Sequence, residues 1–125
     1  MKTTDEKWVY WMECARKYCG CHQKPERSFF FKGYQFPLCA RCTGIAIGHT
    51  VAFLVAPFHV FKFSIALLML PLAVDGLVQY YTSYESNNIK RLISGILYGF
   101  SFTSIVCRCF KSLIKELAAF NRCKN

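Results

Sequence analysis

Three cysteines and one histidine near the start of the chain are the residues best suited to chemistry. Cys39 and Cys42 form a CxxC pair, and the adjacent residues Cys21 and His22 form a second pair upstream. Thiolates at CxxC spacing can reach one ion, and two ligand pairs at this separation are typical of zinc sites. The four side chains predict a tetrahedral metal site suited to zinc, with iron and copper as alternatives by ligand softness.

The CxxC pair also allows a redox interpretation. Cys42 is expected at the N-terminus of a helix, where the helix dipole and free N–H groups lower the pKa of a thiol. Arg41 between the two thiols adds positive potential. A membrane thiol-disulfide oxidoreductase that uses Cys39 and Cys42 is therefore an alternative function. The exact metal ligands are also open, because Cys14 or Cys19 could replace a member of the upstream pair.

The elements that must position these residues are apolar. Of the 125 residues, 54% are hydrophobic, which is more than one domain of this size needs for its core. Three apolar segments, 43–61, 63–81 and 92–110, have 19 residues each. A helix needs about 20 residues to cross a bilayer. The sequence therefore predicts an all-α membrane protein with three transmembrane helices.

The remaining segments are expected to lie outside the hydrocarbon. Residues 1–42 are repeatedly interrupted by charges and predict an interfacial, metal-binding arm, and residues 111–125 predict an amphipathic tail. The whole chain, 1–125, is expected to form a single domain. Two GxxxG patterns, Gly44 with Gly48 and Gly95 with Gly99, predict close packing of the first and third membrane helices.

Alternating membrane crossings would gather the polar residues at one membrane face. The second helix returns to the side where the CxxC pair lies, which places Asp75 and Gln79 near that side on one helical face. The following loop brings Asn87 and Arg91 to the same surface. An ionisable residue in a membrane helix costs about 2.5–3.5 kcal/mol. Asp75 should therefore face the bundle interior, with Arg91 as its expected countercharge.

Asp75, Gln79, Asn87 and Arg91 are accordingly the candidate catalytic residues. In an enzyme, the metal would polarise a substrate oxygen or activate water, Asp75 would handle the proton, and Arg91 would hold an anionic headgroup. A lipid-linked or anionic substrate fits a pocket at headgroup depth. The same residues also allow a non-enzymatic accessory subunit, in which the metal and an ion pair of Asp75 with Arg91 only hold the structure together.

The charge balance bears on partners and location. Lysine and arginine outnumber the acidic residues 16 to 7, but the basic residues flank apolar segments and form no stripe on a polar helix. Membrane lipids are therefore the expected partners, and no nucleic acid is expected. The excess of basic residues on the CxxC side indicates a multi-pass protein of the cell (inner) membrane with a cytoplasmic arm. A reducing cytoplasm favours thiols as metal ligands over a structural disulfide. The oligomeric state is not indicated.

Three motifs carry a family resemblance. The string CHQKPERSFFFKG…PLCARCTG, followed by DGLVQ and ESNNIKRLISG, resembles a family of small bacterial predicted membrane proteins, domain of unknown function 2085, whose function is not established. The resemblance covers residues 21 to about 99. It implies that the four predicted metal ligands and the four polar pocket residues are signature positions of the family. It implies a fold but no reaction.

Overall fold

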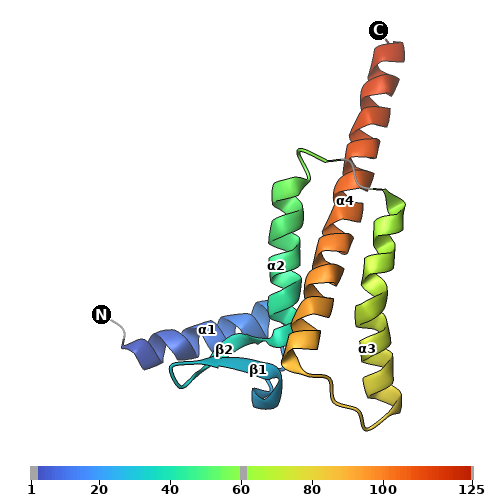
Figure 1. The fold of residues 1–125 in the computed structure, drawn as a ribbon. Coiled ribbons are helices and arrows are strands. Elements are labelled where there is room, and N and C mark those ends of the chain that lie inside the picture. The colour runs from blue at the N-terminus through green and yellow to red at the C-terminus, as the bar shows by residue number, and fades with distance from the viewer. Residues whose placement is uncertain (1–2, 60–61, 125) are drawn as a thin grey trace.

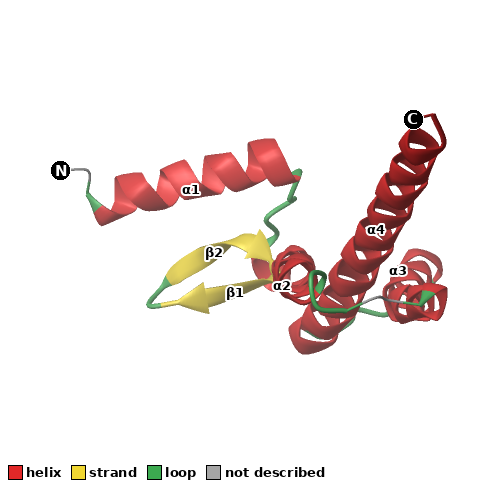
Figure 2. Ribbon diagram, turned by 90° about the horizontal axis from the view of Figure 1, so that it is seen from above, coloured by secondary structure: helices red, strands yellow, loops and turns green. Residues whose placement is uncertain are grey.

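The computed structural model describes residues 3–59 and 62–124. Three helices stand side by side, with α4 between α2 and α3, and a small arm lies beside one end of this bundle (Figures 1 and 2). The elements in chain order are α1 (Thr4–Cys19), η1 (Pro25–Arg27), β1 (Ser28–Phe31), β2 (Tyr34–Cys39), α2 (Ala40–Val55), η2 (Phe63–Met69), α3 (Leu70–Tyr81) and α4 (Asn88–Lys124).

The first helix of the arm, α1, has defined ends. Thr3 and Glu6 form a capping box, in which each side chain accepts a hydrogen bond from the backbone N–H of the other residue. Gly20 ends the helix in the left-handed conformation, at φ 60°. Trp8 attaches α1 to the rest of the arm, because its indole N–H donates to the backbone oxygen of Gln35 at 2.8 Å.

The rest of the arm contains a β-hairpin, which corrects the all-α expectation. Strands β1 and β2 are antiparallel and pair Ser28 with Cys39. They are joined by Lys32 and Gly33, both with positive φ (50° and 83°), as a two-residue hairpin turn requires. The expectation was wrong because the charges in this stretch lie at the turn and the strand ends. The hairpin delivers Cys39 to the start of α2.

Helices α2 and α4 touch through their backbones. A Cβ added at Gly44, Gly48, Gly95 or Gly99 would lie 2.2 to 2.5 Å from a backbone oxygen of the opposite helix. No side chain other than that of glycine fits at these positions. The close packing that the two GxxxG patterns predict is confirmed.

Two of the three expected membrane segments qualify as spans. Residues 63–81 and 88–122 are long and apolar enough to cross a bilayer, and no residue in the apolar window of the first is fully buried by the rest of the protein. Segment 63–81 begins as a 3-10 helix, and Ser101 on α4 holds it by donating to the backbone oxygen of Ile65 at 2.6 Å. Its apolar side chains thus form an outward face that suits lipid.

The expected first span, 43–61, is shorter as a helix. Helix α2 is apolar but has 16 residues, or about 24 Å at 1.5 Å per residue, against about 30 Å of hydrocarbon. Residues 60–61 of that expected segment lie outside the described residues. The third expected span, 92–110, is part of the longer α4, which continues as an exposed helix beyond the end of α2 (Figure 1).

Candidate functional site

The start of α2, the end of α3 and the start of α4 lie at the same end of the bundle, beside the hairpin (Figure 1). A cavity of about 420 Å³ lies at this end. It combines thiols with basic side chains. Its lining includes Cys21, Arg27, Cys39, Arg41, Cys42 and Arg91.

The three thiols form a compact cluster. The Sγ atoms of Cys21, Cys39 and Cys42 all lie within 4.8 Å of one another. They come from the loop after α1, the end of β2 and the first turn of α2, and Cys21 is only 3% exposed. The backbone N–H of Cys39 also donates to the sulfur of Cys21 at 3.2 Å. Three sulfurs this close can ligate one ion.

The cluster favours a thiolate at Cys39. The hydrogen bond with the Cys42 thiol is the largest cause that lowers the pKa of Cys39, to about 5, and burial partly opposes it. The backbone N–H groups of Cys42 and Arg41 lower it further. These free N–H groups belong to the first turn of α2, so the expected effect of a helix N-terminus is present.

Gln23 holds the loop that carries Cys21. Its side-chain amide donates to the backbone oxygens of Met12 at 2.7 Å and of Pro37 at 2.9 Å. Its own backbone oxygen accepts from the Gln35 side chain at 2.7 Å, and its φ is 49°. Gln23 therefore fixes the loop between α1 and β2. Sequence reasoning missed this role, although Gln23 directly follows the predicted ligand pair.

The other predicted ligands lie apart from the thiol cluster. His22 is exposed and lines the same cavity, but neither of its ring nitrogens belongs to the group of close ligand atoms. Cys14 and Cys19 are also outside this group. Cys21 is buried in the cluster while its neighbour His22 is exposed, so the two adjacent residues do not both join the group of close ligand atoms.

Asp75 is paired with Arg41, which corrects the expectation that Arg91 is its countercharge. The Arg41 Nη2 lies 2.6 Å from the Asp75 Oδ2, and the Gln79 amide donates to the same oxygen at 2.7 Å. Arg91 instead donates to the Asn88 Oδ1 at 3.4 Å and lines the thiol cavity. The side chain of Arg41 is long enough to reach α3 from the first turn of α2, a reach that residue order does not reveal.

The four candidate catalytic residues consequently form two groups. Asp75 and Gln79 are bonded to each other on α3, and Asp75 lines a separate hollow with Tyr84. Arg91 lines the thiol cavity. The side chain of Asn87 is exposed, and its backbone oxygen accepts from the backbone N–H of Arg91 at 3.0 Å. Arg41 connects the two groups, because it lines the thiol cavity and binds Asp75.

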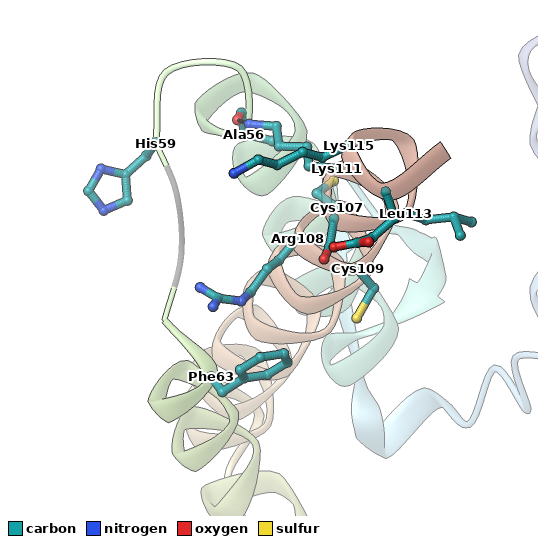
Figure 3. Close-up of a pocket in the computed structure, with 11 residues that line it drawn as sticks. Ala56, His59, Phe63, Cys107, Arg108, Cys109, Lys111, Leu113 and Lys115 are labelled. Carbon is teal, nitrogen blue, oxygen red and sulfur yellow. Dashed lines mark hydrogen bonds between the residues drawn. The ribbon is translucent and has the colours of Figure 1, made fainter. Parts of the chain in front are cut away.

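A second, larger cavity of about 690 Å³ lies at the opposite end of the bundle (Figure 3). It is basic and largely exposed. The Arg108 guanidinium lies 4.4 Å from the centre of the Phe63 ring, and the Lys111 ammonium donates to the backbone oxygen of Ala56. In the described part of the chain, the cysteines there belong to no cluster of three close ligands. The potential for metal chemistry is therefore at the hairpin end.

The chain belongs to the family described as "Predicted membrane protein (DUF2085)", whose model matches residues 21–105. This range contains the three clustered thiols and the three arginines of the cavity, but not α1. Together with the two candidate spans, the match defines a membrane protein.

Two archaeal proteins are similar to the chain in sequence. The chain is 38% identical over 112 residues to an uncharacterized protein of Methanothermobacter thermautotrophicus, with 85% of this chain and 100% of that protein covered. It is 35% identical over 102 residues to an uncharacterized protein of Methanocaldococcus jannaschii, with 75% of this chain and 65% of that protein covered. The expectation of a bacterial family is therefore too narrow. No solved structure matches the chain.

Proposed function

We propose that the chain is a multi-pass protein of the cell (inner) membrane in which Cys21, Cys39 and Cys42 bind one zinc ion on the cytoplasmic side. The convergence of three thiols within 4.8 Å carries this proposal. A redox CxxC pair needs only its two thiols. A tetrahedral metal site also needs at least one further ligand, which often comes from a distant segment. Cys21 supplies that third thiol, and Gln23 holds the Cys21 loop in place.

The site suits chemistry more than a purely structural role. Structural zinc sites use four protein ligands, whereas catalytic sites use three and leave one position open. Here the three thiols line the cavity, which leaves room beside a bound ion for a substrate. Bound zinc would polarise a substrate oxygen or activate water. The cavity lies at the end of the bundle, so a lipid-linked or anionic substrate can approach from the headgroups.

The chain's own residues take different parts in this scheme. Arg91 would bind the negative charge of the substrate. Asp75 is a positioning residue, because its carboxylate holds Arg41 and does not line the thiol cavity. Gln79 supports Asp75, and Asn87 supports the first turn of α4.

Metal analysis of the protein, purified in detergent under reducing conditions, tests the proposal. The wild-type protein is expected to carry about one zinc per chain. Cys21→Ser should lose most of it. Cys19→Ser is the matched control, because Cys19 is exposed, lies two residues away and is outside the cluster. Circular dichroism of each variant would show that the helices are intact.

Two results would contradict the zinc proposal. Equal zinc in Cys21→Ser and Cys19→Ser would exclude Cys21 as a ligand. A metal-free wild-type protein that forms a reversible disulfide between Cys39 and Cys42 would favour a thiol-disulfide oxidoreductase.

A further inference from the structure

Three arginines from separate segments line the thiol cavity: Arg27 in η1, Arg41 in the first turn of α2 and Arg91 in the first turn of α4. Two of them have acidic partners. Arg27 lies 3.6 Å from Glu85, and Arg41 lies 2.6 Å from Asp75. For Arg91, no acidic group lies within ion-pair distance among the residues that the structure describes.

Arg91 is also the most deeply buried of the three. It is 4% exposed, and its Nε and Nη2 atoms have no hydrogen-bond partner within the described ranges 3–59 and 62–124. The buried Nε atoms of Arg27 and Arg41 have none there either. Buried charged donors normally have acceptors, because leaving them unpaired is costly. Unpaired buried donors thus belong to all three arginines that line the cavity.

We infer that this cavity binds a phosphate group between Arg27, Arg41 and Arg91. A carboxylate has two coplanar oxygens and is satisfied by one guanidinium fork. A phosphate presents its oxygens in a tetrahedron, which suits guanidinium groups that arrive from three elements. The cavity volume of about 420 Å³ leaves room for a group attached to the phosphate. The headgroup of a phospholipid and free phosphate share this chemistry.

This inference rests on the proposed function in one respect. The bound phosphate would belong to a substrate that is held beside the metal. The binding itself depends on the arginines. Asn88 helps to position Arg91, because its Oδ1 accepts from Arg91 and its Nδ2 donates to the backbone oxygen of Ser28, both at 3.4 Å. The hairpin is thereby connected to the phosphate site.

Binding measurements on the full chain in detergent test the inference. Native mass spectrometry would follow titration with phosphatidate, which has a phosphomonoester headgroup, and with phosphatidylcholine as the reference lipid. Calorimetry would follow titration with inorganic phosphate. Arg91→Gln should weaken binding of the preferred ligand at least about tenfold, the usual effect of losing a charged hydrogen bond. Arg91→Lys keeps the charge but loses the guanidinium fork, so its affinity for the ligand should lie between those of the wild type and Arg91→Gln.

Arg108→Gln is the matched control. Arg108 is on the same helix but lines the cavity at the opposite end (Figure 3). The Arg108→Gln protein should bind the preferred ligand with the affinity of the wild type. Preference for phosphatidate over inorganic phosphate would identify a lipid source, and the reverse preference would identify free phosphate. Equal loss in both variants, or no binding of either ligand to the wild type, would overturn the inference.

Zinc analysis of the same preparations separates this inference from the zinc proposal. Arg91-dependent binding in a metal-free wild-type protein would leave the phosphate site standing without the zinc site. If the wild type and Arg91→Gln both carry zinc and bind the ligand equally well, the zinc site would stand and the phosphate site would be excluded. Loss of zinc in Arg91→Gln together with unchanged ligand binding would show that Arg91 only balances the thiolates.

If Arg91→Gln does not fold, Arg27→Gln decides the question. The Arg27 side chain is 37% exposed, so its loss is better tolerated than that of Arg91. Arg27→Gln should weaken binding of the preferred ligand severalfold. Wild-type affinity in a folded Arg27→Gln protein would then overturn the three-arginine site.

Discussion

Arg41 and Asp75 are joined by an ion pair, with 2.6 Å between Nη2 and Oδ2, although the two residues are 34 positions apart. Their side chains are 29% and 15% exposed, so water screens this pair less than it screens an exposed one. The pair connects the turn between the two CxxC thiols to α3. It therefore couples the geometry of the thiol cluster to the position of a candidate membrane span.

Breaking this pair should destabilise the protein. Asp75→Asn leaves the Arg41 charge without a partner and is expected to cost about 1–3 kcal/mol. In a double-mutant cycle with Arg41→Gln, the two changes should be non-additive by about 0.5–3 kcal/mol. Unfolding by SDS titration in mixed micelles measures both quantities.

Glu85→Gln is the control for that cycle. Glu85 is 69% exposed and lies 3.6 Å from Arg27, so its loss should cost less than about 1 kcal/mol. Additive effects of the Arg41 and Asp75 changes would show that the pair makes no net contribution.

Two glycine substitutions should have effects of opposite sign. In Gly44→Ala, the new Cβ would lie 2.2 Å from the backbone oxygen of Leu92, so α2 and α4 must separate, at a cost of about 1–3 kcal/mol. Gly76 on α3 has nothing within 4 Å of an added Cβ, and Gly76→Ala should stabilise the helix by about 0.5–1 kcal/mol. The same micelle titration measures both, and destabilisation by Gly76→Ala would contradict the open surroundings of Gly76.

The zinc affinity of His22→Ala distinguishes an open metal site from a closed one. With three thiol ligands and an open position, the substitution should change the zinc affinity less than about threefold. Competition with a chromogenic chelator gives this number. A loss of affinity as large as that in Cys21→Ser would make His22 the fourth ligand, and the closed site would then suit a non-enzymatic accessory subunit.

Gln23→Ala should loosen the loop that presents Cys21. The substitution removes the two hydrogen bonds to backbone oxygens that help to hold the backbone at φ 49°. Residues that support metal ligands typically affect metal affinity by about 10–100-fold. We therefore expect Gln23→Ala to bind zinc about 10–100-fold more weakly than the wild type, as measured by competition with the chromogenic chelator. Lys24→Ala, the exposed neighbour, should bind zinc as the wild type does.

Reporter fusions test the three-span topology with a cytoplasmic arm. A periplasmic alkaline phosphatase fused after Ser83, between α3 and α4, should be inactive, and one fused to the C-terminal end of α4 should be active. This pattern follows only if the 16-residue α2 crosses the bilayer as α3 and α4 do. The reversed pattern would contradict either the three crossings or the orientation.

Local patterns in the sequence predicted part of this structure. The glycine spacings determine which surfaces of α2 and α4 can approach, and the CxxC spacing places one thiol at the N-cap and the other in the first turn of α2. Both patterns depend on residues a few positions apart, so chain geometry alone relates them. Cys21 was also predicted, because a second ligand near a CxxC pair has a characteristic separation.

Other features depend on how far a side chain reaches between elements. Arg41 and Arg91 are equally plausible partners of Asp75 by residue order, and only the positions of α2, α3 and α4 decide between them. His22 and Cys21 are neighbours, but only Cys21 is buried among the clustered thiols. The hairpin was missed because its charges suggested an interfacial arm without strands, although Lys32 and Gly33 are a two-residue turn between aromatic residues.

The four-glycine contact between α2 and α4 leaves no intervening side chains whose rotation could let these helices slide or tilt. The walls of the cavity that carry the CxxC turn and Arg91 therefore keep a constant spacing in membranes of different thickness. Helix α3, which lies on the opposite side of α4 from α2, contributes no residue to the cavity lining that the structure describes and is connected to it through Asp75, which binds Arg41. The width of the cavity between the CxxC turn and Arg91 would thus depend on the packing of α2 against α4 and not on the position of α3.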